Sequence, residues 1–118
     1  MLHTNAIFPE RRYRLLAAPR RRYLLWHLSR RESTTVEEAA ARIAAWEAGV
    51  SADEVAQELY DRVRLSLVHS HLPRLADHAV VDYDRASGEV ELQTELSGWL
   101  RTDDPPVDLD GADTIDRS

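Results

Sequence analysis

The feature that most constrains this fold is residues 60–93, where one amphipathic helix leads directly into a short β-hairpin. Apolar residues recur there at three- and four-residue spacing, which predicts the buried face of a helix over residues 62–77. These apolar residues are Leu65, Val68, Leu72 and Leu75. We expect the rest of the chain to be organised around this helix and hairpin.

The opposite face of the 62–77 helix carries small hydroxyl side chains and guanidinium groups. It comprises Arg62, Ser66, Ser70, Pro73 and Arg74. Small side chains permit close approach to a DNA groove, and arginines reach phosphates or guanine edges. A solvated helix face has a similar composition, so this face alone does not establish DNA binding. Pro73 either kinks the helix or accompanies a break near Ser70, which would then cap a short final helix.

The residues after this helix predict a hairpin. Two antiparallel strands are expected at Val80–Asp84 and Glu89–Gln93, the second with the alternation of a half-buried strand. The loop between them contains one cation, Arg85, and Gly88, which can take the positive φ that closes a short hairpin. Helix and hairpin together predict an α+β, mostly helical fold, a winged helix-turn-helix with a two-stranded antiparallel wing.

Prolines mark two helices near the N-terminus. Pro9 suits the first turn of a helix that carries Tyr13 and Leu16, and Pro19 either breaks that helix or starts the next one. The run Arg20–Arg22 lies at the start of this second helix, where the helix dipole disfavours cations. Either a bound phosphate or a salt bridge to the acid-rich segment that follows would compensate for this charge. Candidate acids are Glu37, Glu38 and Asp61.

Two capping signals organise the middle of the chain. Thr35 lies three residues before Glu38, a capping box that begins an alanine-rich helix. Gly49 suits the C-terminal cap of that helix. Ser51 and Glu54 form a second capping box, which predicts the start of another helix. The sequence leaves open whether that helix continues unbroken into the 62–77 helix.

The length of 118 residues indicates a single domain. We expect residues 1–8 to be frayed, residues 9–101 to form the winged-helix domain, and residues 102–118 to form a disordered acidic tail. Leu96 and Trp99 either pack on the core or form a dimer patch. The tail, with six aspartates, either shields the DNA-binding face or keeps the protein soluble, and the second interpretation is favoured.

Charge and composition indicate the salt environment and the cellular location of the protein. All 15 basic residues are arginine, against 21 acids, which gives a net charge of −6. An excess of acids keeps a surface hydrated where salt screens charge, so we expect a halophilic protein. Eight of the arginines lie in residues 1–31 with one acid, so a basic footprint is expected on the first helices and on the outer face of the 62–77 helix. The absence of cysteine, of a long apolar run and of a signal-peptide core predicts a cytoplasmic protein without membrane contact.

Three segments resemble the ArsR-like winged-helix regulators: Leu16–Leu25, Thr35–Ala40 and His71–Val81. The segments Trp46–Gly49 and His69–Pro73 are more closely similar to a group of small haloarchaeal winged-helix proteins that carry a domain-of-unknown-function label. The resemblance implies a fold like that of transcription regulators and a haloarchaeal source. It implies no operator and no ligand.

Neither a metal, a cofactor nor a small-molecule ligand is expected. His69 and His71 are two residues apart, which on a helix places them about 200° from each other, so they cannot share one ion. His71 is expected to be packed or capping, and His27 and His78 to lie at the surface or its boundary. Without a cysteine nucleophile or a glycine-rich phosphate loop, an enzyme is not expected. Ala79 stands where glycine usually precedes the wing, which costs little unless the backbone there needs a positive φ.

Two functions remain. The first is a transcriptional regulator that binds double-stranded DNA, with the 62–77 helix in the major groove and the wing on the backbone. Its predicted contacts are Arg62, Ser66, His69, Ser70, Arg74 and Arg85. The second is a winged-helix protein–protein interaction module that does not bind DNA, which the acids of the wing favour. By analogy with winged-helix regulators, a homodimer is expected through Tyr13 and Leu16 or through the Trp99 segment. The sequence gives neither the operator and signal nor the choice between activation and repression.

Overall fold

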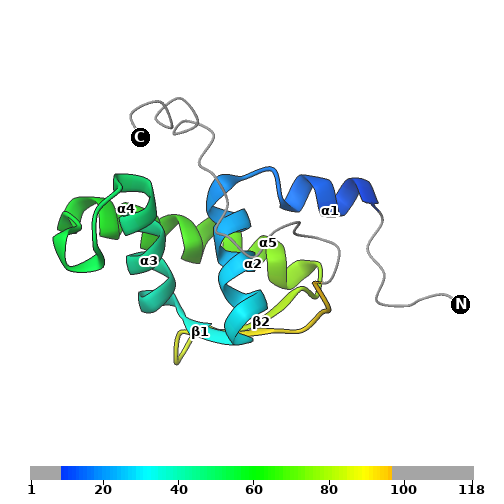
Figure 1. Cartoon of the computed structure of the whole chain (residues 1–118). Helices are drawn as coiled ribbons and strands as arrows, with labels where there is room; N and C mark the ends of the chain where they lie inside the picture. The colour runs from blue at the N-terminus through cyan, green and yellow to red at the C-terminus, as the bar shows by residue number, and fades with distance from the viewer. Residues whose placement is uncertain (1–8, 97–118) are drawn as a thin grey trace, which may run out of the picture.

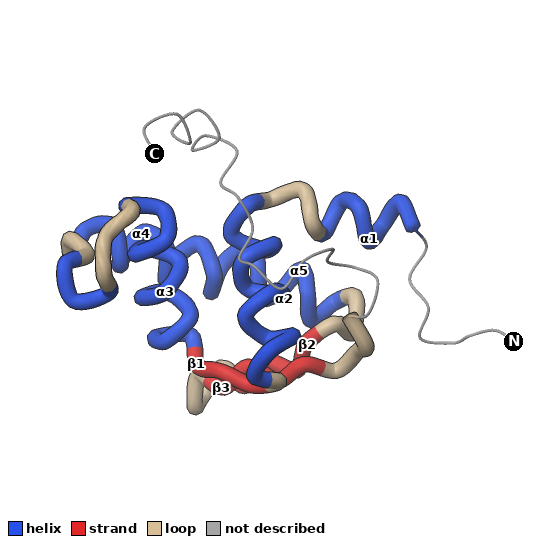
Figure 2. Tube along the Cα trace, viewed as in Figure 1, coloured by secondary structure: helices blue, strands red, loops and turns tan. Residues whose placement is uncertain are grey.

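The computed structural model describes residues 9–96 of the chain, and those at 9–11 by backbone alone. The elements in chain order are α1 (Pro9–Leu15), α2 (Pro19–Arg31), β1 (Ser33–Thr35), α3 (Val36–Ala48), a 3-10 turn η1 (Ala52–Glu54), α4 (Gln57–Ser66), a π turn η2 (Leu67–His71), α5 (Leu72–Asp77), β2 (Val81–Asp84) and β3 (Glu89–Leu92). The strands lie together along one edge of the molecule and the helices stand above them (Figures 1 and 2). This is the predicted α+β winged-helix fold. The expected frayed segment 1–8, the acidic tail 102–118 and Trp99 lie outside the described residues.

The core lies between α2, α3 and the helical run from α4 to α5. The apolar stripe of α2, formed by Leu24, Leu25 and Leu28, is fully buried. Ile43 of α3 and Val90 of the sheet are buried with it. Burial of these side chains supplies the main favourable free energy of the fold.

The helical run from α4 through η2 to α5, here called the third helix, is continuous from Gln57 to Asp77. The sequence left this continuity undecided. Pro73 does not break the run, and the backbone stays helical through Ser70. Instead, the wide π turn that ends at His71, two residues before Pro73, accommodates a residue that has no N–H to donate. Of the two alternatives left open by the sequence, the break capped by Ser70 is therefore excluded.

The π turn also changes which residues face the core. Val63 and Leu67 are buried four residues apart, and the next buried positions are Leu72 and Leu75. The step of five from Leu67 to Leu72 is the extra residue of the π turn. The predicted seam is therefore wrong at Leu65, which is 56% exposed, because regular helical spacing was assumed across this turn. Val68, also assigned to the seam, is half-buried.

The sheet has three strands in the order β1-β3-β2, all antiparallel. The predicted wing is present as β2 and β3, and Gly88 has the expected positive φ, 82°. The additional strand, β1, pairs Thr34 with Val90. Thr35 both ends β1 and caps α3, since its hydroxyl accepts a hydrogen bond from the Glu38 N–H at 3.1 Å. The capping signal was predicted, but the strand that precedes it was not.

The chain leaves α5 through a left-handed residue, Ala79, with φ 60°. The Val80 N–H donates to the Leu75 carbonyl at 2.9 Å and the Ala79 N–H to the Ala76 carbonyl at 3.0 Å. Both bonds and the left-handed residue belong to the turn that commonly ends helices at glycine. The backbone therefore does need a positive φ at this position, and an alanine in this conformation costs about 1 kcal/mol.

The segment between α3 and α4 differs in part from expectation. Gly49 caps α3 as predicted, with φ 70°. The second capping box is wrong: Ser51 donates its hydroxyl to Asp53 at 2.7 Å, and the chain makes only the short turn η1 before α4 begins at Gln57. A three-residue turn followed by extended backbone at Val55 separates the two helices.

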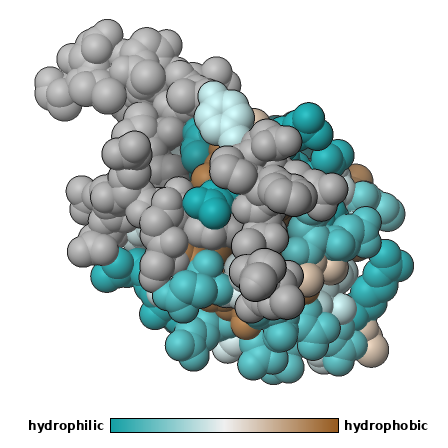
Figure 3. Space-filling model, turned by 90° about the vertical axis from the view of Figure 1, so that its right-hand side faces the viewer, coloured by the Kyte–Doolittle hydropathy of each residue, from teal (hydrophilic) through white to brown (hydrophobic). Residues whose placement is uncertain are grey.

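The arginines at the start of α2 hold α1 in place. Arg21 donates to the carbonyls of Leu15 at 2.7 Å and Arg14 at 3.0 Å, and Arg22 donates to that of Leu16 at 2.9 Å. These carbonyls end α1, where cations interact favourably with the helix dipole. Helix α1 extends away from the other helices (Figure 1), and the described surface on that side of the molecule is mostly hydrophilic (Figure 3).

Arg20 has a salt-bridge partner in the acid-rich segment, as one of the two alternatives proposed. The partner is Glu47, which accepts from Arg20 Nη2 at 2.9 Å, and not one of the three acids named from the sequence. The hydrogen bond to Glu47 raises the pKa of Arg20.

The expectation that His27 lies at the surface or its boundary is wrong. His27 is buried, with its Nε2 3.2 Å from Thr34 Oγ1, and burial lowers its pKa.

No helix in residues 9–96 is both long enough and apolar enough to cross a membrane.

Candidate nucleic-acid interface

The third helix carries an exposed stripe on the side away from the core. Arg62, Leu65 and His69 are all exposed: Arg62 and Leu65 lie three residues apart in α4, and His69 follows in the π turn. The Arg62 side chain is 63% exposed, and its Nη1 lies 4.0 Å from Glu58 Oε2. The stripe therefore offers a guanidinium, an isobutyl group and an imidazole to solvent.

One flank of the stripe leads to the wing. Arg64 Nη2 lies 3.6 Å from Glu37 Oε2 at the start of α3. Glu37 also borders the hairpin turn, since a Cβ placed on Gly88 would lie 3.4 Å from Glu37 Oε1. Arg85 is exposed in that same turn. Glu37 therefore links the wing to the third helix, with an arginine on each.

The other flank of the stripe faces the start of α2. Ser66 is half-buried there; it accepts a hydrogen bond from Arg20 Nη1 at 3.0 Å and donates one to the Val63 carbonyl at 2.9 Å. The Arg20 guanidinium also holds Glu47 of α3. Because its hydroxyl is engaged within the protein, Ser66 helps to fix the third helix against α2 and α3.

Further along this flank, cations gather around His71. Arg21 Nη1 lies 3.2 Å from His71 Nδ1. Burial, followed by the charges of Arg21, Arg20 and Arg74, lowers the pKa of His71 to about 4. Burial and then the charge of Arg74 lower the pKa of Arg21. His71 is therefore neutral at neutral pH and packed inward, as predicted, while Arg74 itself is exposed.

The predicted site residues thus fall into four places. Arg62 and His69 lie on the exposed stripe, with the exposed Ser70 directly after them in the chain. Arg74 lies on the α2 flank and Arg85 in the wing. Ser66 lies within the Arg20 hydrogen-bond network.

Sequence reasoning missed two residues of this surface. Leu65 was assigned to the core, and only the position of the π turn shows that it faces outward. Arg64 was assigned to neither face; its link to Glu37 joins two segments that are distant in the chain. Within residues 9–96, no group of three or more His, Asp or Glu side chains is arranged to hold a metal ion.

Residues 13–91 match the family described as a domain of unknown function (DUF7344). The chain belongs to this family. The matched region runs from Tyr13 in α1 to Glu91 in β3, so it includes the third helix and the wing. No curated protein and no solved structure matches the chain.

Proposed function

We propose that this protein of the DUF7344 family is a DNA-binding transcriptional regulator whose third helix enters the major groove. The observation that carries the proposal is the exposed stripe of Arg62, Leu65 and His69 on the third helix of a winged-helix fold. In such a fold this helix reads base edges, and the wing touches the backbone. An exposed leucine fits this role, because apolar side chains recognise the thymine methyl group.

The flanks of the stripe supply the phosphate contacts in this proposal. Arg64 and Arg85 reach the DNA backbone on the wing side of the stripe, and Arg74 reaches it on the α2 side. Ser70 contacts the DNA between these two sides. Ser66 positions the helix through Arg20 rather than contacting DNA. DNA binding by Arg62 would break its 4.0 Å ion pair with Glu58. The loss costs little free energy, because exposed ion pairs contribute little to stability.

The wider setting is also a proposal. The arginine-only basic residues and the net charge of −6 fit a halophilic, archaeal source and an ArsR-like relationship. In molar salt, screening acts within a few ångströms, so an acidic protein is not repelled from DNA at range. A homodimer would give two half-sites. Of the two candidates near α1 for the dimer surface, Tyr13 is 77% exposed and Leu16 is partly buried against the core.

Capture of genomic DNA fragments in molar potassium chloride tests the proposal. Wild-type protein should enrich a few promoter regions, and Arg62→Gln with Arg74→Gln should lose this enrichment. The matched control is Arg30→Gln with Arg31→Gln, which removes the same charge at the end of α2, away from the stripe. Circular dichroism checks that each variant is folded. Each lost phosphate contact should also lower the salt dependence of binding by about 0.9 in the logarithmic slope.

A winged-helix module that binds another protein and leaves DNA alone is the second candidate. The observation that favours it is the pairing of acids across the wing, where Asp82 lies opposite Glu91 and Asp84 opposite Glu89. Like charges directly opposite are unfavourable, and a cationic partner would relieve them. If no fragment is enriched by folded wild-type protein, or if both double variants bind like wild type, the groove assignment is wrong and this second candidate is favoured.

A further inference from the structure

A hollow in the described surface lies between α2, α3 and η1. It has a volume of about 670 Å³. This is within the range of small-molecule sites. Its lining comprises Tyr23, Glu38, Ala41, Arg42, Ala45, Trp46, Gly49, Val50 and Ala52. None of these residues belongs to the exposed stripe of the third helix or to the wing.

The hollow has an apolar base and an aromatic wall. Ala41 and Ala45 lie one helical turn apart on α3, and their small side chains leave the space that larger ones would fill. The rings of Tyr23 and Trp46 lie 5.0 Å apart between centroids. Val50, which is partly exposed, forms the rim. A flat apolar group would therefore find aromatic carbon on one side and methyl groups on the other.

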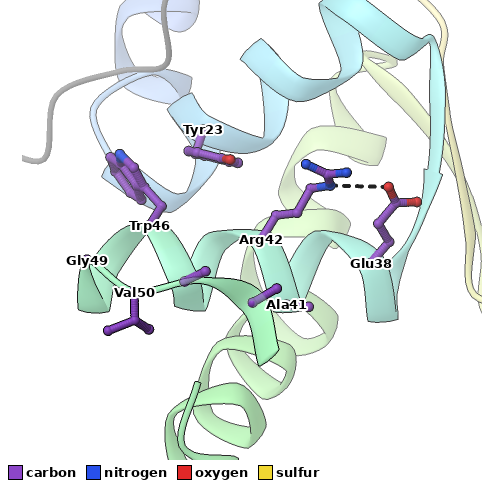
Figure 4. A pocket seen from close by; sticks show the side chains of 9 residues that line it. Tyr23, Glu38, Ala41, Arg42, Trp46, Gly49 and Val50 are labelled. Atoms are coloured by element: carbon purple, nitrogen blue, oxygen red, sulfur yellow. Dashed lines mark hydrogen bonds and ion pairs between the residues drawn. The ribbon is translucent and has the colours of Figure 1, made fainter. Parts of the chain in front are cut away.

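Two hydrogen-bond donors converge beside this wall. Figure 4 shows Trp46, Tyr23, Arg42 and Glu38 in a row, with the hydroxyl end of Tyr23 directed toward Arg42. Arg42 Nε donates to Glu38 Oε2 at 3.2 Å, and within residues 9–96 its Nη1 and Nη2 groups and the Tyr23 hydroxyl make no hydrogen bond. Burial raises the pKa of Tyr23, so the hydroxyl remains a donor at neutral pH.

The charge beside these donors is positive. Glu38 Oε2 is shared between Arg42 and Arg31, which lies 3.3 Å away. One carboxylate therefore faces two guanidinium groups, and the cluster retains a net positive charge. A carboxylate is the anion whose geometry suits the forked Nη1 and Nη2 donors of an arginine.

We infer that the hollow binds a small carboxylate with a flat apolar body, whose carboxylate contacts Arg42 and the Tyr23 hydroxyl and whose body lies against Trp46, Ala41 and Ala45. The inference does not depend on DNA binding. It differs from the expectation from sequence, which included no small-molecule ligand, because Tyr23 and Arg42 come from separate helices and no motif joins them.

The test uses phenylacetate as the probe and its neutral analogue phenylacetamide as the comparison, with ¹⁵N-labelled full-length protein. Phenylacetate should shift the Trp46 indole signal, assigned with Trp46→Phe, in a saturable way. Its dissociation constant should be about a millimolar, as expected for so small a ligand. Phenylacetamide should bind at least about tenfold more weakly, because it lacks the charge that strengthens hydrogen bonds to arginine.

Two variants test the two halves of the site. Arg42→Met should weaken phenylacetate binding about tenfold while leaving phenylacetamide unchanged. Ala45→Leu should fill the hollow and remove binding of both, with the helix retained, because leucine is a good helix former. The matched control is Arg64→Met, since Arg64 forms a similar pair with Glu37 on the other side of α3.

Three results would overturn the inference. One is the absence of a saturable Trp46 shift with folded wild-type protein. Another is equal binding of phenylacetate and phenylacetamide, which would indicate an apolar groove without a carboxylate site. The third is unchanged phenylacetate binding by folded Arg42→Met or Ala45→Leu, which would place the probe elsewhere on the protein.

Discussion

Leu65 and Leu67 provide a direct test of the π turn in the third helix. The two residues have the same side chain and lie two positions apart, but Leu67 is fully buried and Leu65 is 56% exposed. Leu67→Ala should lower the free energy of unfolding by about 3–4 kcal/mol, the cost of a buried leucine with the cavity it leaves. Leu65→Ala should change it by less than about 0.5 kcal/mol, as expected for a surface substitution.

The measurement is urea unfolding followed by circular dichroism for wild type and both variants under one salt condition. The slope of free energy against urea should be the same for all three, so that the midpoints report stability alone. In a domain with a total stability of about 5–15 kcal/mol, the expected difference between the variants is readily measured. Equal losses in the two variants, or a larger loss in Leu65→Ala, would show that the regular helical spacing holds and that the π turn is absent.

The same pair of variants also bears on function. Leu65→Ala removes an apolar side chain from the exposed stripe without disturbing the core. If the stripe reads DNA, this variant should lose affinity for enriched fragments by about 1–3 kcal/mol while staying as stable as wild type. Folded Leu65→Ala that keeps full affinity would exclude Leu65 from the interface, although Arg62 could still contact phosphate.

Further predictions concern the turn, the wing and the pH dependence. Ala79→Gly should raise the free energy of unfolding by up to about 1 kcal/mol, because glycine takes φ 60° without strain; a lower urea midpoint would contradict the assigned turn. Glu91→Lys should stabilise the protein by about 0.2–1 kcal/mol in low salt, by placing a cation opposite Asp82, and molar salt should remove the gain. A pKa of about 4 for His71, below its ordinary value near 6.5, means that the unfolded chain binds this proton more readily. Stability should therefore fall as pH drops from about 6.5 to about 4, and His71→Leu should flatten that part of the profile in urea unfolding at several pH values.

The parts of the fold that followed from the sequence are those with local signals. Pro19 starts α2, Thr35 caps α3, and Gly49 and Gly88 take positive φ, each because one residue determines the backbone near it. The wing was predicted for the same reason, since alternation and a turn glycine lie within a few residues. Ala79 shows the limit of such signals, because the backbone adopts the left-handed conformation there although the residue is not glycine.

The parts that did not follow depend on contacts across the chain or on a change of helical period. β1 is three residues long and exists through its pairing with β3, which no local pattern in 33–35 reveals. Leu65 was misplaced because a π turn cannot be read from apolar spacing. The hollow beside Arg42 is formed by residues of α2, α3 and η1, so the sequence gives no sign of it.

The run Arg20–Arg22 illustrates why a basic run is a weak sign of a nucleic-acid site. Each of these arginines uses its guanidinium within the protein: Arg20 joins Glu47 to Ser66, and the other two hold the carbonyls that end α1. The run therefore fixes the position of the third helix and of α1 instead of presenting free charge. If this protein binds DNA, its basic contacts come from arginines outside this run: Arg62, Arg64, Arg74 and Arg85.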